Sequence, residues 1–325
     1  MGKWPILKRR VNPLRHLAGL PKSARWLPPC WKGLTMKKPQ NLLTKMSAKE
    51  FFFFFGPLLV IYAIYYLFST GFLVYTSLQK VSIALVNGKW VGLRNFELLL
   101  TDPRFLIALK NNFLFAGVAI GAGLTIGFLI AVLISSGTRG RSMLYTIFLL
   151  PTLMPLALIA TVFRTSLEAR MGALNETLRA IGLDAFALNW LIEPNLAIGV
   201  VCILFVYLIG LPIMYYVANL STINTSLIEA AILDGAKTPR LMWEILFPLM
   251  KGTHRTIIIS TLLTSFRAFD IVFFSTGGGP GGVTEITGTY VYGFSTSGSN
   301  VGYGSAAALI AMLAALLISL IQLRK

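Results

Sequence analysis

Five long stretches of this sequence contain no Asp, Glu, Lys or Arg, and this feature restricts the fold more than any other. The uncharged stretches are Phe51–Gln79, Asn111–Thr138, Ser142–Phe163, Pro194–Ile228 and Ile286–Leu323. Each is longer than the roughly 20 apolar residues that a helix needs to cross about 30 Å of hydrocarbon. A sixth stretch, Thr256–Thr276, is apolar except for Arg267 and Asp270. The sequence therefore predicts an all-α integral membrane protein with six transmembrane helices.

The composition agrees with this prediction and bears on one alternative for the first stretch. The chain of 325 residues is 55% hydrophobic and only 13% charged, whereas a soluble protein of this length needs more charge to cover its surface. A cleaved signal peptide would have an apolar region of about 7–15 residues near the start of the chain. Here residues 1–50 come first and the apolar run is far longer, so we expect Phe51–Gln79 to be an uncleaved transmembrane helix.

The positive charges are concentrated on one side of the predicted spans. The net charge is +17, and residues 1–50 contain 12 Lys and Arg against one acidic residue. With a cytoplasmic N-terminus, 20 Lys and Arg lie in the inside segments 1–50, 135–142, 219–255 and 324–325, and 7 lie in the outside segments 79–110, 168–194 and 277–302. This bias predicts that both termini are cytoplasmic. We interpret residues 1–50 as a basic tail on anionic lipid, in preference to nucleic-acid binding, and residues 51–325 as the transmembrane domain.

The cysteines and histidines do not suggest a metal or catalytic site. Cys30 lies in the tail and Cys202 in the fourth predicted span, while His16 and His254 are isolated in the sequence. A metal site needs several such ligands at close spacing. The sequence therefore predicts a chain that is not an enzyme and that binds no metal or cofactor itself.

The segment 219–255, between the fourth and fifth spans, is predicted to carry two short cytoplasmic helices. Ser226 and Glu229 have the spacing of a capping box, which predicts a helix start at Ser226. Gly235 is expected to end this helix after about two turns. Thr238 is expected to cap a second helix that has Pro239 at its first position.

The first of these helices has the features of a docking element. Ala230 and Ala231 leave one of its faces thin enough to enter a groove on a partner. Glu229 and Asp234 offer carboxylates to basic groups there.

The same segment resembles the EAA loop of permeases in binding-protein-dependent ABC importers. The resemblance rests on Glu229-Ala230-Ala231, then Gly235 after three residues, then Ile245 and Pro248 after nine more. Phe247 stands where the family usually has Leu. The resemblance implies that the loop docks into a cleft on an ATP-hydrolysing subunit and transmits its closure to the membrane helices. ATP and Mg would then be bound by partner chains, since this chain has no Walker motif.

Further motifs are similar to the carbohydrate-uptake branch of that family, which includes maltose and glycerol-phosphate permeases. They are Asn95-Phe96, Asp102-Pro103, Leu150-Pro151, Asn189-Trp190-Leu191, Asp234-Gly235-Ala236 and Thr276–Pro280. The resemblance implies a five-helix permease core after an N-terminal helix, in the bacterial cytoplasmic (inner) membrane. It also implies a heterodimer with a second permease, two ATPase subunits and an extracytoplasmic solute-binding protein. Overall likeness points to the alginate-oligosaccharide subgroup.

Two departures from that branch leave the solute open. Asn111-Asn112 stands where the family often has Asn-Thr at the start of the second helix. Phe163-Arg164 stands where a Trp is often found near the end of the third.

Glycines follow the fifth predicted span, at Gly277–Gly282. This run lacks the Gly-Lys-Ser/Thr ending of a phosphate-binding loop, and the predicted topology places it outside. We interpret it as a flexible external loop in which Gly278, Gly279 and Pro280 contact the solute-binding protein.

The fifth predicted span is the least apolar and is therefore the best candidate for a substrate pathway. Thr261, Thr264, Ser265 and Ala268 share one helical face, whose hydroxyls could bind sugar hydroxyls. Ser and Thr in membrane helices also pack against neighbours or bond to their own backbone. The sequence does not favour the sugar-binding interpretation over this structural one.

Three further residues extend this candidate pathway. Arg267 and Asp270 are charges within a span, which favours a functional role. They could pair with each other, or Arg267 could meet an acidic sugar such as a uronate. Tyr207 in the fourth span could stack on a sugar face or pack between helices.

Other functions remain compatible with these features. A membrane scaffold or sensor could use the same loop for docking alone. A proton- or sodium-driven carrier should have buried acidic residues in several spans. Asp270 is the single acidic residue within the predicted spans, which disfavours a carrier of this kind. Within the importer class, the alternative is another solute such as glycerol phosphate.

Overall fold

The computed structural model describes residues 48–84, 88–137, 140–297 and 300–323. These residues fall into two parts, divided between residues 65 and 66. The predicted basic tail, with Cys30 and His16, lies outside the described residues except for positions 48–50.

The first part contains one described α-helix, α1 (Ala48–Ala63), which passes into the π-helical turn η3 (Ile64–Phe68). Its side chains are mostly apolar and exposed, including five consecutive phenylalanines from Phe51 to Phe55. A helix that is apolar on all sides is suited to a lipid environment.

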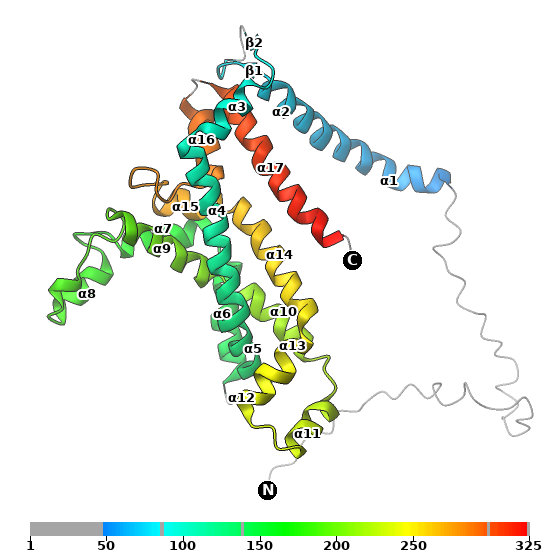
Figure 1. The fold of residues 1–325 in the computed structure, drawn as a ribbon, viewed down its shortest axis with the longest axis vertical. Helices are drawn as coiled ribbons and strands as arrows, with labels where there is room; N and C mark the ends of the chain where they lie inside the picture. The colour runs from blue at the N-terminus through cyan, green and yellow to red at the C-terminus, as the bar shows by residue number, and fades with distance from the viewer. Residues whose placement is uncertain (1–47, 85–87, 138–139, 298–299, 324–325) are drawn as a thin grey trace, which may run out of the picture. The chain divides into compact units, whose positions relative to one another are not determined.

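The second part is a succession of helices with short connections (Figure 1). After α2 (Ser69–Ser77), strand β1 (Gln79–Lys80) pairs antiparallel with β2 (Lys89–Trp90). The next elements are α3 (Arg94–Thr101), α4 (Pro103–Ala122), η4 (Gly123–Gly127), α5 (Phe128–Ser135), α6 (Arg141–Leu153), α7 (Leu156–Ser166), α8 (Ala173–Ala180), η5 (Asp184–Phe186), α9 (Pro194–Tyr207) and α10 (Gly210–Leu220). The remaining elements are α11 (Thr225–Leu233), α12 (Thr238–Arg240), η6 (Leu241–Leu246), α13 (Phe247–Leu249), α14 (Lys251–Arg267), α15 (Phe269–Ser275), α16 (Thr287–Ser297) and α17 (Val301–Leu323).

Within the described residues, four helices are long and apolar enough to cross a membrane. They are Phe51–Ser77, Pro103–Ser135, Pro194–Leu220 and Val301–Leu320. Two bent pairs, α6 with α7 and α14 with α15, bring the number to six if each pair forms one span. The prediction of an all-α membrane protein with about six spans is therefore confirmed at the level of helix type, length and composition.

The two bent pairs have different local causes. Pro151 lies inside α6 and Pro155 directly precedes α7, and the two helices are bent by 99°. A proline removes a backbone donor and collides with the preceding turn, which is why these residues predict a kink. Helices α14 and α15 are bent by 50° at Ala268, whose ψ of 45° lies outside the helical region. No proline marks this second break.

The long helix made of α4, η4 and α5 is the axis of the second part. It begins before the uncharged stretch that starts at Asn111, because Asp102 caps it. The Asp102 carboxylate accepts the N–H of Arg104 at 2.8 Å, and Pro103 occupies the first turn. The helix ends at Ser135, and Gly137 turns the chain away with a φ of +77°.

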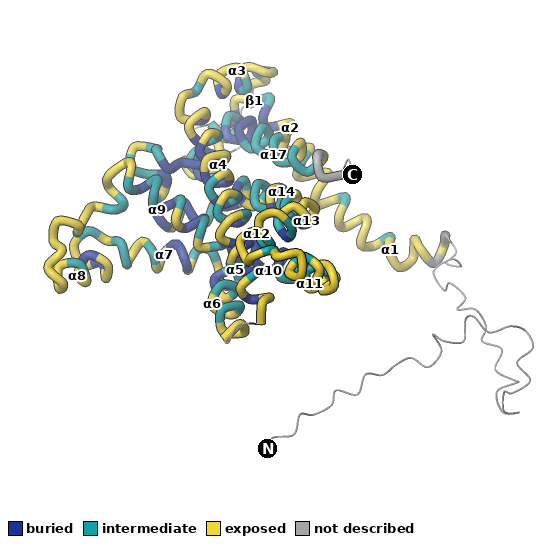
Figure 2. The backbone as a smooth tube through the Cα atoms, turned by 60° about the horizontal axis from the view of Figure 1, so that its bottom comes forward, coloured by how far each residue is buried: buried dark blue, intermediate teal, exposed yellow. Residues whose placement is uncertain are grey.

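Buried side chains form three clusters along this axis, and exposed residues predominate on α8 and α11 (Figure 2). Each cluster contains at least one pair of buried aromatic rings: Phe105 with Tyr290, Phe115 with Phe205, and Phe128 with Tyr216, at ring distances of 5.4, 5.4 and 5.5 Å. Helix α3 lies near the start of α4, and α11 lies beyond the end of α5 (Figure 1). The two helices thus lie at opposite ends of this axis, and the sides of a membrane on which the segments 79–110 and 219–255 lie stay a prediction.

Candidate coupling helix and transport cavity

The predicted docking helix is present as α11, but its start differs from the prediction. Asn224, not Ser226, is the capping residue, and its Oδ1 accepts the N–H of Ser226 at 3.1 Å. The capping box predicted from Ser226 and Glu229 is therefore wrong. Asn caps helices as well as Ser does. Because Asn224 comes two positions before Ser226, the helix begins directly after Asn224.

The end of α11 is formed by Gly235, as predicted. Its φ is +84°, its N–H donates to the Ile232 carbonyl at 3.0 Å, and the N–H of Ala236 reaches the Ala231 carbonyl at 3.0 Å. These bonds satisfy carbonyls that the last helical turn leaves free. The second helix, α12, is capped by Lys237 instead of Thr238, so Pro239 is its second residue. The prediction for Thr238 and Pro239 was one position too late.

The surface of α11 is exposed on most sides. Glu229, Ala230 and Asp234 are exposed and Ala231 is half-buried. Leu233, next to these residues, has 88% of its surface exposed. A short helix that presents both apolar and acidic side chains to the outside has the character of an unoccupied contact surface.

Aromatic side chains connect the segment after α11 to the membrane helices. The Phe247 ring lies 5.1 Å from Phe128 of α5 and 4.2 Å from His254 of α14. The Trp243 ring lies 5.7 Å from Phe128. Pro248, the last residue of the predicted loop motif, is exposed in α13. A displacement of this segment would therefore press directly on two membrane helices.

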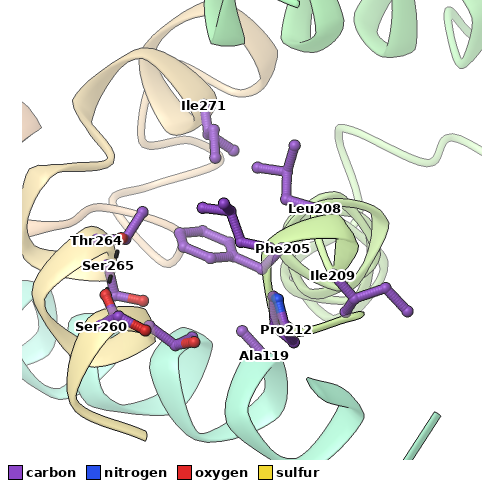
Figure 3. A pocket seen from close by; sticks show the side chains of 11 residues that line it. Ala119, Phe205, Leu208, Ile209, Pro212, Ser260, Thr264, Ser265 and Ile271 are labelled. Atoms are coloured by element: carbon purple, nitrogen blue, oxygen red, sulfur yellow. Dashed lines mark hydrogen bonds between the residues drawn. The ribbon is translucent and has the colours of Figure 1, made fainter. Parts of the chain in front are cut away.

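A small cavity lies between α14 and the helices α4, α9, α10 and α15 (Figure 3). Its volume is about 60 Å³. The lining comprises Ala119 of α4, Phe205, Leu208, Ile209, Leu211 and Pro212 from α9, α10 and their junction, Ser260, Thr261, Thr264 and Ser265 of α14, and Ile271 of α15. The predicted hydroxyl face of α14 thus borders a cavity, although Ala268 packs in the core instead.

The hydroxyl groups at this cavity differ in their hydrogen bonds. Thr264 Oγ1 donates to the Ser260 carbonyl at 2.8 Å, and Ser260 Oγ donates to the Ile257 carbonyl at 3.2 Å. Ser265 Oγ is buried and has no hydrogen-bond partner. A buried hydroxyl without a partner carries a desolvation penalty, which a ligand hydroxyl could remove.

The other pathway candidates do not reach this cavity. Arg267 and Asp270 lie on either side of the break at Ala268, and these two described residues form no ion pair with each other. Because the break interrupts the turn that would bring them together, their predicted internal pairing is not seen. Tyr207 is 43% exposed, and its ring packs 5.4 Å from that of Phe163.

The glycine loop, residues 276–286, is held by hydrogen bonds and is not an open coil. Thr284 Oγ1 lies 2.7 Å from Thr276 Oγ1 and donates to the Gly279 carbonyl at 2.7 Å. Gly278, with a φ of +88°, is buried, while Gly279 and Pro280 are half-buried. Neighbouring Gly277 and Gly281 are the exposed glycines of this loop.

Sequence reasoning missed a polar cluster at the start of α4. Arg104 forms an ion pair with the buried Glu285, and the Asp102 carboxylate accepts the hydroxyl groups of Tyr290 and Tyr303. Burial alone would raise the pKa of Asp102, but these bonds and the Arg104 N–H outweigh it and hold the pKa below its ordinary value.

Two buried amides next to that cluster were also missed as a site. Asn111 and Asn112 are buried in α4, and both bond to residues of the glycine loop or its ends. Two consecutive Asn residues at the edge of an apolar stretch were the available signal. Within the described residues, no group of three His, Cys, Asp or Glu side chains could hold a metal ion.

A mostly apolar cavity with hydroxyl groups on its α14 side, among membrane-length helices, is compatible with a transport permease. Residues 123–324 match the family described as binding-protein-dependent transport system inner membrane component, and the chain belongs to this family.

The relatives are permeases of ABC transporters. The probable ABC transporter permease protein YurN of Bacillus subtilis is 30% identical over 254 residues, which are 77% of this chain and 87% of that protein. The sulfoquinovosyl glycerol transport system permease protein SmoG of Agrobacterium fabrum is 27% identical, over 83% of this chain and 87% of that protein. A chain in the crystal structure of a bacterial ABC transporter involved in the import of the acidic polysaccharide alginate has the same fold. Its TM-score is 0.69 at 22% identity, over 84% of this chain and 94% of that chain.

Proposed function

We propose that this chain is the transmembrane subunit of an ATP-driven importer that passes a carbohydrate across the cytoplasmic membrane. The observation that carries the proposal is α11, an exposed helix that ends at Gly235 and is followed by Trp243 and Phe247, whose rings contact α5 and, for Phe247, α14. Membership of the binding-protein-dependent family supports transport as the activity. The cavity at Ser265 supports a solute that carries hydroxyl groups.

The size of the cavity indicates how the solute must pass. Ligand pockets in proteins have volumes of roughly 300–1,000 Å³. A cavity of about 60 Å³ cannot hold an oligosaccharide, so α14 and α9–α10 must separate during transport. The proposed mechanism is alternating access, in which these helices separate to admit the solute. The bends at Ala268 and at Pro151–Pro155 divide two spans into segments that can move separately.

The partners follow from the placement of α11. The proposal has ATP and Mg bound by two ATPase subunits, whose closure displaces the segment Glu229–Gly235 and, through it, Phe247. A second permease completes the membrane unit, and an extracytoplasmic binding protein delivers the solute to the side of Gly278–Pro280. Both termini are then cytoplasmic, as the charge bias predicts.

Substituting the acidic residue of the docking helix tests this coupling. Glu229→Lys reverses a charge on α11, and Glu97→Lys makes the same change on an exposed glutamate of α3, at the other end of the axis. We expect Glu229→Lys to reduce both co-purification of the ATPase subunits and uptake, and Glu97→Lys to leave both unchanged. If uptake persists while the ATPase subunits no longer attach, the coupling account is wrong. That outcome is the one expected if the chain is instead a docking scaffold.

The solute is tested by the ATPase activity of the complete complex. The binding protein is loaded in turn with maltose, alginate oligosaccharides, sulfoquinovosyl glycerol or glycerol 3-phosphate. We expect an oligosaccharide to give the largest stimulation, with an acidic one such as alginate as the specific candidate. If glycerol 3-phosphate alone stimulates the ATPase activity, the transported solute is glycerol 3-phosphate and not an oligosaccharide. Stimulation by none of the four would contradict the proposed solute class.

A further inference from the structure

One buried amide, that of Asn112, caps two helices at the same time. Its Nδ2 donates to the Ser265 carbonyl at 3.0 Å, and its Oδ1 accepts the N–H and the hydroxyl of Thr287 at 2.9 and 3.0 Å. The Asn112 side chain is completely buried. Within the described part of the chain, Ser265 and Thr287 are the hydrogen-bond partners of its amide group.

Each of these bonds satisfies a helix end. Ser265 is in the last turn of α14, where carbonyls lack intrahelical partners, and its carbonyl otherwise receives a long 3.4 Å bond from the Ala268 N–H. Thr287 is the first residue of α16, where N–H groups lack partners. Asn112 therefore joins the end of one helix to the start of another.

The segment between those two ends is the break, α15 and the glycine loop. Residues 268–286 thus begin and end next to residues that Asn112 binds. The same side of α4 holds this segment at two more positions. Asn111 Nδ2 donates to the carbonyls of Val283 and Glu285, both at 2.8 Å, and Arg104 pairs with the Glu285 carboxylate. Residues seven or eight apart in a helix lie on one face, which explains the alignment of Arg104 with Asn111 and Asn112.

Asn112 also lies close to the cavity, through its bond to Ser265. Ser265, whose backbone is held by Asn112, lines the cavity with its side chain, and its hydroxyl has no partner. A displacement of the glycine loop that moves Thr287 must therefore either move Ser265 as well or break the bonds at Asn112.

We propose that Asn112 is a positioning residue that couples the glycine loop to Ser265, so that docking of a loaded binding protein on the loop changes the cavity. This inference rests on the proposed function. The groups that respond are the Thr287 N–H on the loop side and the Ser265 carbonyl on the cavity side. Asn112 itself does not touch the solute.

The test uses the complete complex with the binding protein loaded with whichever of the four named solutes stimulates the wild type. Asn112→Leu keeps the approximate volume and removes all three hydrogen bonds. We expect the maximal stimulation of ATP hydrolysis over its basal rate to fall by about fivefold or more, in line with typical coupling between sites. The binding-protein concentration that gives half-maximal stimulation should remain that of the wild type, because Asn111 and Arg104 still hold the docking loop.

Asn175→Leu is the matched control. Asn175 is also completely buried and also makes three hydrogen bonds, to the carbonyls of Ala169 and Leu188 and from the indole of Trp190, at 3.1, 2.9 and 2.8 Å. Its loss should lower thermal stability but leave the stimulation ratio of the assembled complex unchanged. Equal losses of the ratio in both variants would reduce Asn112 to a structural residue and overturn the proposal.

A milder variant decides the question if Asn112→Leu does not assemble. Thr287→Val removes the hydroxyl bond to Asn112 and keeps the backbone bond, so we expect a smaller fall in the ratio at unchanged half-saturation. A wild-type ratio in Thr287→Val together with a wild-type ratio or no assembly in Asn112→Leu would overturn the proposal. A wild-type complex that is stimulated by no loaded binding protein would instead contradict the proposed function.

Discussion

Arg104, near the start of α4, and Glu285, at the end of the glycine loop, form a bidentate ion pair. Arg104 Nε lies 2.6 Å from Glu285 Oε2, and Nη2 lies 2.7 Å from Oε1. The arginine side chain is 61% exposed, whereas that of Glu285 is 4% exposed. The pair therefore attaches the loop to α4 through a carboxylate that has been removed from water.

Removing the arginine should destabilise the protein more than removing both charges. Arg104→Met leaves the Glu285 carboxylate buried without its cation, which typically costs about 1–3 kcal/mol. Arg104→Met combined with Glu285→Gln should recover part of this loss, because the remaining amide is neutral. The Tm of the purified protein measures both. Arg94→Met, on an exposed arginine of α3 that has no ion pair within the described chain, is the control and should leave Tm unchanged. A Tm for Arg104→Met equal to that of the control would show that the pair does not stabilise the fold.

This ion pair shows what the sequence could not reveal. Arg104 and Glu285 are 181 positions apart, and neither stands in a motif, so their contact depends on how the helices pack. Asn112 is a similar case, since an amide at the edge of an apolar stretch has many possible partners. The membrane spans could be predicted because the length of each run is itself the physical requirement.

The local predictions succeeded where one residue type decides the geometry. Gly235 was predictable because a positive φ favours glycine. A bend at Pro151–Pro155 follows in the same way from the residue type, because proline lacks an N–H. The start of α11 was not, since Asn224 and Ser226 are comparable capping residues two positions apart. The break at Ala268 has no local signal. It depends on the packing of α15 against α7 and α9.

A side chain at Gly235 should weaken coupling through the backbone alone. Its φ of +84° is strained for any L-residue with a Cβ, at about 1–2 kcal/mol, although nothing lies within 4 Å of the added atom. Gly235→Ala should therefore distort the end of α11 and reduce attachment of the ATPase subunits. Co-purification and uptake are the measurements.

Gly182→Ala provides the control for this strain. Gly182 has a φ of +78° and equally open surroundings, but it follows α8, far along the chain from α11. The two variants should lose similar thermal stability, and the Gly182 variant should retain its ATPase subunits. Equal loss of attachment in both would mean that general destabilisation, and not the shape of α11, is responsible.

Gly210 should be essential for the packing of α10 against α6. A Cβ there would lie 2.2 Å from Thr152 Oγ1 and 2.4 Å from the Phe148 carbonyl oxygen. Because the carbonyl belongs to the backbone, the helices would have to separate, and overpacking of this kind costs about 1–3 kcal/mol or more. We expect Gly210→Ala to lower Tm. Gly199→Ala in the same span meets nothing within 4 Å and should leave Tm unchanged or raise it slightly. Equal Tm values for the two variants would contradict the close approach of α6 and α10.

The carboxylate of Asp102 should make stability depend on acidic pH. Its pKa lies below the ordinary value of 3.8, because hydrogen bonds from Tyr290, the Arg104 N–H and Tyr303 outweigh the effect of burial. The folded state therefore binds a proton less readily than the unfolded state does. The stabilisation from this group is fully present above the ordinary pKa, and it is lost as the pH falls through the lower pKa of the folded state.

Asp102→Asn separates this contribution from the rest of the acid response. The amide cannot ionise, so the variant should have a lower Tm than the wild type at pH 6–8. As the pH falls below about 4, the wild-type Tm should decline towards that of the variant, since protonated Asp102 loses its charge-assisted bonds. Thermal unfolding of both proteins from pH 8 to pH 3 measures the difference in Tm. A difference that stays constant over this range would show that the hydrogen bonds from Tyr290 and Tyr303 do not depend on the charge of Asp102.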